Sequence, residues 1–278
     1  MKTMVGATMA SKELRISLHS MLRKEFSDLK THSDDDQFDV NQNIHEVRKC
    51  IKAILAIIIL YKTNTDEATY SQWKSYLKAL KGQCASLRES YVNLQTFSKL
   101  EDELNELDKV HFDELGGILE TKYKSLVTGN QRIKGILKQL HNSIDKIALA
   151  INQSSVNSDL EILQKRHKKT LQKTKQLFEV LTINSNANDF HRLRRWSRYL
   201  YLQQSIFERE GFLKVSSKKN KLLHELNDYL GEEHDLQSFF QYLKENFTSI
   251  SKMAEPIFIE KIDKLREKIL KQYPAIYS

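Results

Sequence analysis

The sequence predicts an all-α protein made of two four-helix-type bundles that an internal duplication relates by a pseudo-two-fold axis. Its 278 residues include only 8 Gly and 2 Pro, so little interrupts long helical stretches. Apolar residues recur at helical spacing almost throughout, and no segment alternates with period two, so we expect no sheet. A short basic motif also returns 146 residues further along the chain. Such a return at constant spacing indicates a duplicated unit.

The first half, residues 1–153, contains helical segments separated by short polar or Gly-containing stretches. The second segment has Asn41 or Asn43 as its N-cap, and the third opens at Thr65-Asp66-Glu67. Glycines mark a bend near Gly82 and an interruption at Gly116-Gly117. We therefore expect helices over about residues 14–30, 41–62, 65–94, 109–127 and 133–151.

The second half, residues 154–278, repeats this order after the polar stretch Asn152–Ser158. A very basic helix comes first, over about residues 159–182, and the helix that contains His191 follows a polar loop. Pro is tolerated at the first helical position, so a Glu-Pro pair predicts the start of the last helix. The residues expected to begin or end these helices are Asn188 or Asp189, Ser216-Ser217, Glu255-Pro256 and Pro274.

Charge is distributed unevenly over the two halves. The formal net charge of +8 and the pI near 9.2 favour an anionic partner or surface. Residues 1–153 contain 22 Lys and Arg against 20 Asp and Glu, whereas residues 154–278 contain 22 against 16. We therefore expect the second half to dominate any binding of anions.

The sequence also predicts the compartment. Cys50 and Cys84 lie at largely apolar helix positions without metal-ligand spacing, so we interpret them as core thiols in a reducing compartment. The N-terminus is too polar for a secretory signal. The most hydrophobic run, Ala53–Tyr61, is shorter than the roughly 20 residues of a membrane helix. We expect a soluble cytoplasmic protein that does not contact membranes, and the sequence indicates no oligomeric state.

Two basic stripes carry the chemistry that the repeat indicates. Each has a His followed by basic residues at offsets of three, four and seven, which places all four on one helix face over roughly 10 Å. Like charges at this spacing destabilise a helix, so the stripe requires either neighbouring acids or an anionic ligand. Arg offers a planar fork to phosphate oxygens, Lys a point charge and His a pH-dependent donor. The candidate binding residues are His45, Arg48, Lys49 and Lys52 in the first half and His191, Arg194, Arg195 and Arg198 in the second.

The helix before the second stripe is also basic. Residues Lys165–Lys175 contain seven basic or His positions and no acid. A surface helix normally intersperses Glu, so this composition favours a helix that faces an anion. The candidates here are Lys165, Arg166, Lys169 and Lys173.

A second motif follows each stripe at the same distance. Leu230-Gly231 precedes Asp235 in the second half, and Cys84-Ala85 precedes Glu89 in the first. Gly or Ala permits close helix approach, and the acid can accept hydrogen bonds from a neighbouring Arg or His. We interpret Asp235 and Glu89 as residues that orient the basic stripes rather than as catalytic acids.

The sequence contains no motif for catalysis. It has no Gly-rich phosphate loop, no helical HExxH and no nucleophile elbow. It also lacks a cluster of carboxylates for a catalytic metal. We therefore expect a binding protein, not an enzyme, with no cofactor and no metal.

The His-x-x-Arg-basic-x-x-basic helix followed by Leu-Gly-x-x-x-Asp, in two copies, resembles the CHAD family, the conserved histidine α-helical domain. The resemblance covers roughly residues 8–278 and is best in the second half, at Phe190–Arg195 and Leu230–Asp235. It implies a pair of four-helix bundles, the two halves of one domain, around a basic surface that binds inorganic polyphosphate. Family members are binding modules that often work beside triphosphate-tunnel enzymes.

The first half departs from this pattern. Ala53, Leu55 and Ala56 stand where family members commonly continue with further Arg, and Glu89 replaces the Asp. These changes leave the expected fold intact and disfavour a symmetric, fully basic pocket.

The leading functional prediction is therefore a protein that binds inorganic polyphosphate without catalysing a reaction, in the cytoplasm or on polyphosphate granules. The first alternative is a nucleic-acid-binding helical protein, although aromatic residues suited to base stacking are not interleaved with the stripes. The second is an accessory subunit of a phosphate-metabolising enzyme.

Overall fold

The computed structural model describes residues 15–34, 40–128, 130–214 and 216–277, and nearly all of them lie in helices, which confirms the all-α prediction. The first half contains β1 (Arg15–Ser17), α1 (Leu18–Asp34), α2 (Val40–Leu60), a 3-10 turn (Lys62–Asn64), α3 (Glu67–Gln83), α4 (Ala85–Ser98), α5 (Glu101–Val127) and α6 (Asn130–Gln153). The second contains β2 (Asn157–Asp159), α7 (Leu160–Glu179), α8 (Ala187–Arg209), α9 (Ser217–Asn246), α10 (Thr248–Lys271) and α11 (Tyr273–Tyr277).

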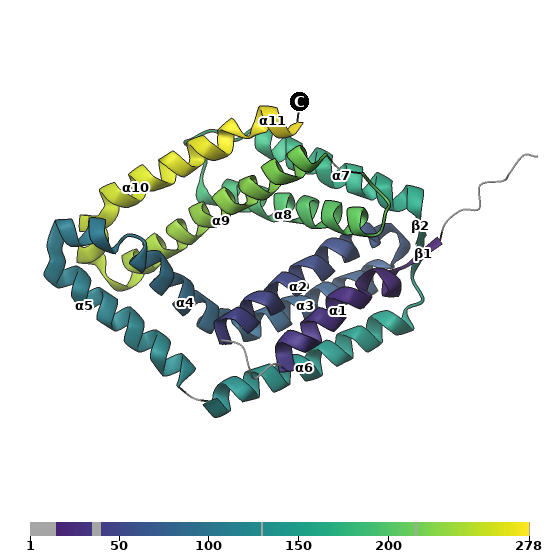
Figure 1. Ribbon diagram of the computed structural model, residues 1–278, viewed down its shortest axis with the longest axis horizontal. Helices are drawn as coiled ribbons and strands as arrows, with labels where there is room; N and C mark the ends of the chain where they lie inside the picture. The colour runs from purple at the N-terminus through teal and green to yellow at the C-terminus, as the bar shows by residue number, and fades with distance from the viewer. Residues whose placement is uncertain (1–14, 35–39, 129, 215, 278) are drawn as a thin grey trace, which may run out of the picture.

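The order of elements is similar in the two halves. A short strand and two helices open each half, and the long α9 occupies the sequence positions that α3 and α4 share in the first. Helices of the two halves pack on one another as α2 on α8, α4 on α9 and α5 on α10. Figure 1 shows α2 and α8 near the middle of the molecule, with α5 and α10 along the outside. This order supports the internal duplication, which stays a prediction.

The halves share part of their core. One apolar cluster lies mainly in the first half and another in the second, but a third contains Phe97 and Phe112 together with Phe239 and Phe258. The rings of Phe240 and Phe258 stack at a centroid distance of 4.8 Å within it. Because this cluster joins α4 and α5 to α9 and α10, burial of apolar area holds the two halves together.

The expectation of no sheet was wrong. Strands β1 and β2 form an antiparallel ribbon in which Ile16 pairs with Ser158. Each strand has only three residues, which is too short to display a period-two pattern. The ribbon also shifts the start of the first helix from the expected Leu14, which lies outside the described residues, to Leu18.

The expected interruption at Gly116-Gly117 was also wrong, because α5 continues through both residues. A Cβ at position 116 would lie 2.8 Å from the Phe97 ring, so this glycine allows α4 and α5 to approach closely. The irregularity in α5 is instead at Asp108, whose φ of −162° and ψ of 92° are not helical. The Asp108 carboxylate accepts a 3.2 Å hydrogen bond from the His111 backbone N–H and so caps the following segment. The break near Gly82 is confirmed, since α3 ends at Gln83.

Three further boundaries differ from expectation. Asn186, not Asn188 or Asp189, is the N-cap of α8, since its side chain accepts a hydrogen bond from the Asp189 N–H. Asn41 and Asn43 lie inside α2, where both are buried. Pro256 lies inside α10, which begins at Thr248, because Ala254 and Phe258 are buried against α9 and keep the helix continuous on both sides.

Two expectations about the chain's environment can be compared with the structure. Cys50 and Cys84 are free thiols and both are buried, as expected for core residues. Burial raises the pKa of Cys50 to about 12 and that of Cys84 to about 11, so neither is a reactive thiolate near neutral pH. Within the described ranges, no helix combines the length and the apolar character needed to cross a membrane.

Candidate functional site

The basic stripes of α2 and α8 meet where these two helices pack. One face of α2 is apolar, and its buried residues include Val47, Ile51 and Ile54. The side chain of Gln203 on α8 donates a 2.9 Å hydrogen bond to the carbonyl oxygen of Ala56 on α2, which joins the helices beneath the stripes. The packing therefore brings together two sets of cations that the sequence separates by 146 residues. We call this set the cation cluster, defined as Arg48, Lys52, Lys81, Arg88, Arg194 and Arg198 with His45, His191 and His234.

Lys52 lies among the other cations of the cluster. Burial lowers the pKa of Lys52 to about 7, and the charges of Arg198, Arg194, Arg48 and Lys81 contribute in that order. These four neighbours come from α8, α2 and α3. The free protein therefore holds Lys52 in surroundings that disfavour its own charge, and a bound anion would relieve this.

Among the residues that the structure describes, Arg194 is the cation of the cluster that forms an ion pair with a carboxylate. Its guanidinium lies 3.8 Å from the Asp235 carboxylate of α9. A Cβ at Gly231 would lie 4.0 Å from the same guanidinium, an ordinary van der Waals distance, so this position lies beside the pair without crowding it. Burial lowers the pKa of Arg194 while Asp235 raises it, and burial raises the pKa of Asp235 against the pull of Arg194. Asp235 is thus an ion-pair partner of Arg194 at a distance longer than that of a hydrogen bond, and its role in orienting the stripe stays a prediction.

Imidazole rings line the cluster in both halves. The rings of His191 and His234 lie 5.0 Å apart. Burial, followed by the charges of Arg194 and His191, lowers the pKa of His234 to about 3, so this ring is neutral near pH 7. Burial and then the charge of Arg88 lower the pKa of His45. The charge of Arg88 thus acts on His45 in the first half and that of His191 on His234 in the second, between positions that are 43 residues apart in both.

The sequence reasoning missed some members of the cluster as binding residues. Arg88 and His234 lie within the second repeated motif, each directly before its acid, so the repeat could have identified them. Lys81 has Asn227 at the repeat-related position, so no pattern distinguished it from other surface lysines. Its pKa is lowered by burial and by the charges of Arg48 and Arg194, and Arg48 donates a 3.2 Å hydrogen bond to its backbone carbonyl.

Two predicted stripe residues lie at the margin. The Lys49 ammonium is exposed and lies 2.8 Å from the Glu46 carboxylate. Arg195 is exposed, and its charge lowers the pKa values of His191 and Tyr199. Glu89 is exposed as well, and no ion pair joins it to another residue that the structure describes.

The predicted residues of α7 are not among the charges that act most strongly on Lys52 and Arg194, although α7 packs against α2. Lys165 and Lys169 are exposed and Lys173 is half-buried, whereas the Arg166 guanidinium donates a 3.4 Å hydrogen bond to the Ile59 carbonyl. The charges that act most strongly on Lys52 and Arg194 come from α2, α3, α8 and α9, not from α7.

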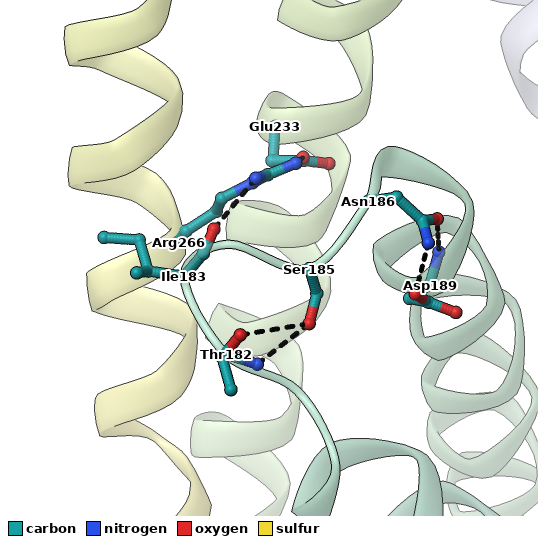
Figure 2. A network of polar contacts seen from close by, with 7 residues as sticks. All are labelled: Thr182, Ile183, Ser185, Asn186, Asp189, Glu233 and Arg266. Atoms are coloured by element: carbon teal, nitrogen blue, oxygen red, sulfur yellow. Dashed lines mark hydrogen bonds and ion pairs between the residues drawn. The ribbon is translucent and has the colours of Figure 1, made fainter.

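A buried ion pair supports the start of α8. Figure 2 shows Arg266 of α10 between Glu233 of α9 and the loop before α8. Arg266 donates hydrogen bonds of 3.2 and 3.1 Å to Glu233 and one of 2.9 Å to the Ile183 carbonyl. Its guanidinium also lies 4.4 Å from the centre of the Phe190 ring, next to His191. The pair therefore fixes three elements that position the second stripe.

The arrangement suits a ligand with many closely spaced negative charges. The cluster contains six Lys and Arg, and among the residues that the structure describes one of the six, Arg194, forms an ion pair with a carboxylate, that of Asp235. Partly buried charges are screened less by salt than exposed ones, so their attraction for an anion is stronger than that of a solvated helix face. Among the described residues, no group of three or more His, Cys, Asp or Glu side chains could hold a metal ion.

A family model and two solved structures match most of this chain. The family model described as "CHAD domain" matches residues 20–270. The crystal structure of the CHAD domain from the plant Ricinus communis aligns with a TM-score of 0.58 at 12% identity, covering 93% of this chain and 92% of that one. PptA from Streptomyces chartreusis aligns with a TM-score of 0.58 at 13% identity, covering 93% and 94%. No curated protein matches. At these identities the solved structures show the same fold.

Proposed function

This chain belongs to the CHAD domain family, and on that premise we propose that it binds inorganic polyphosphate through the cation cluster. The observation that carries the proposal is the environment of Lys52, which is partly buried among Arg198, Arg194, Arg48 and Lys81. Charges gathered in this way cost folding free energy, because burial disfavours each charged form and the like charges repel. A polyanion would offset that cost.

Binding follows from multivalent charge pairing. A polyphosphate carries at least one negative charge per phosphate and a surrounding layer of counterions, as a nucleic acid does. When Lys and Arg replace those counterions, the counterions are released, so affinity falls steeply as salt rises. The guanidinium groups of Arg48, Arg194 and Arg198 can each contact two phosphate oxygens. Longer chains occupy more cations at once and bind more tightly.

In this proposal the protein is a binding module that catalyses no reaction of its own. It works in the cytoplasm, where it can bind the polyphosphate of granules. The family resemblance supports this role. A nucleic acid presents the same phosphate charge, so the experiment must separate the two polymers.

A competition assay tests the proposal. Labelled polyphosphate bound to the protein is challenged with unlabelled polyphosphate, DNA, RNA and ATP at fixed ionic strength. We expect polyphosphate to compete best at equal charge, and preference for DNA or RNA would overturn the proposal. The variant Lys52→Gln/Arg198→Gln should lose affinity. The control Lys221→Gln/Lys252→Gln, which removes the same charge from exposed positions of α9 and α10, should not.

A further inference from the structure

A cleft lies beside the cation cluster, between α4, α9 and α10. It has a volume of about 250 Å³ and is lined by Lys99, Lys261, Lys264 and Lys268, with Glu232 and Asp235 as its acids. The side chains of Gln95 and Thr96 add polar groups to its wall. Cations therefore outnumber acids in this cleft by four to two.

Two of the four lysines have carboxylate partners. Lys261 lies 2.5 Å from Glu103, and Lys264 pairs with Glu260. Neither of these acids lines the cleft. Within the part of the chain that the structure describes, no ion pair joins Lys99 or Lys268 to a carboxylate. Lys268 instead has its ammonium 5.7 Å from the centre of the Tyr229 ring. Lys99 and Lys268 can thus pair with an incoming anion.

The cleft is continuous with the cation cluster through Asp235. This residue lines the cleft and also contacts Arg194, at 3.8 Å. Lys99 of the cleft is among the cations that act on Asp235, together with Arg194, Arg88 and Lys52 of the cluster. An anionic chain that extends from the cluster past Asp235 therefore enters a cleft in which Lys99 and the other lysines outnumber the acids.

We propose that this cleft is a second anion subsite, which binds phosphates of a polyphosphate chain that continues beyond the cation cluster. The inference rests on the proposed function and adds a physical basis for selecting chain length. Tripolyphosphate is short enough for all of its phosphates to bind in the cluster, whereas a long chain also contacts Lys99 and Lys268. Of the two ion-paired lysines, Lys261 joins α10 to Glu103 of α5, whereas Lys264 pairs with Glu260 within α10.

The test compares two ligands on one variant. Lys99→Gln/Lys268→Gln should weaken binding of long polyphosphate about tenfold and lower the slope of log affinity against log salt by about two. Binding of tripolyphosphate should change less than twofold. The control Lys221→Gln/Lys252→Gln loses the same charge from exposed positions of α9 and α10 outside the cleft and should leave both ligands unaffected.

The outcomes separate this inference from the proposed function. An equal loss for both ligands, or no loss for the long chain, would overturn the second subsite while leaving polyphosphate binding intact. Wild-type protein that binds neither ligand would overturn the proposed function, and the subsite with it.

Discussion

Helices α2 and α8 carry the same pattern of basic residues but hold their cations differently. On α8, Arg194 has the Asp235 carboxylate at 3.8 Å. On α2, the repeat-related Arg48 donates a 3.2 Å hydrogen bond to the Lys81 carbonyl oxygen and forms no ion pair with any residue in the described ranges. Glu89, which corresponds to Asp235, is exposed. Arg194 of the second stripe thus has a carboxylate partner, whereas in the first stripe the carboxylate, that of Glu46, pairs with Lys49 at the margin and not with Arg48.

The difference shows that a repeated motif does not ensure a repeated electrostatic environment. Lys52 on α2 corresponds to Arg198 on α8, and burial brings the pKa of Lys52 to about 7, so part of the first stripe's charge is lost near neutral pH. In the same stripe, Lys49 forms an ion pair with Glu46, which partly neutralises its charge. The second stripe, with three Arg, keeps its full charge.

The largest expected effect is on affinity. Arg194→Gln/Arg195→Gln/Arg198→Gln should weaken polyphosphate binding about 100-fold, since the exposed Arg195 adds little and two charged contacts of roughly 1.5 kcal/mol each are lost. Arg48→Gln/Lys49→Gln/Lys52→Gln should weaken it about tenfold, since Lys49 is paired with Glu46 and Lys52 is partly neutral, which leaves about one such contact to lose. Gln keeps helix propensity, so circular dichroism should be unchanged. Binding curves at several salt concentrations give both the affinity and the slope. Equal losses would indicate a symmetric site, and no loss from either variant would mean that the stripes are solvated faces.

The next effect concerns stability. Glu233, 2% exposed, pairs with Arg266, 10% exposed, whereas the repeat-related residue in the first half is the buried Leu87. Glu233→Leu leaves Arg266 buried without its carboxylate and should lower the free energy of unfolding by about 3 kcal/mol. Adding Arg266→Met should recover most of that loss, because two apolar side chains can pack in place of the pair. Urea denaturation measures both, and equal stability of the single and double variants would contradict this account.

A third effect is pH dependence, which we assign to the first stripe. Bound phosphates favour the charged form of Lys52, so above its pKa of about 7 binding takes up a proton, and affinity should fall by up to about tenfold per pH unit. Lys52→Arg should flatten the profile, because Arg stays protonated. A profile that does not change in this variant would assign the dependence to other groups.

The lowered pKa of Lys52 also makes the stability of the folded protein depend on pH. The pKa of Lys52 is lower in the folded protein than its ordinary value of 10.5. The unfolded chain therefore binds more protons between pH 7 and 10.5, and the cost of burying Lys52 is full below pH 7 and declines as pH rises through this range.

The smallest expected effect compares the two acids. Asp235→Asn removes the charge but keeps an acceptor oxygen for Arg194, so polyphosphate affinity should rise about threefold as one repulsive charge disappears. Glu89→Gln removes the same charge from an exposed position and should change affinity less than twofold. A fall in affinity for Asp235→Asn would mean that its charge is needed to orient Arg194.

The sequence predicted the features that depend on periodicity and repetition. Helical spacing indicated α2 and α8, and the offsets of His45 and His191 indicated two stripes with apolar residues behind them. Features that depend on single contacts in space could not be predicted. Gly116 resembled a helix break until its contact with Phe97 was known. Lys81 has no repeat partner, and only the packing of α3 beside α2 brings it into the cluster.

The most direct measurement is a crystal structure of the protein with bound polyphosphate. We predict phosphates between α2 and α8, with oxygens within about 3 Å of the charged groups of Arg48, Lys52, Arg194 and Arg198. Phosphates bound only along Lys165–Lys175 of α7, with the space between the two stripes unoccupied by ligand, would contradict the claim that cations of both halves form one site.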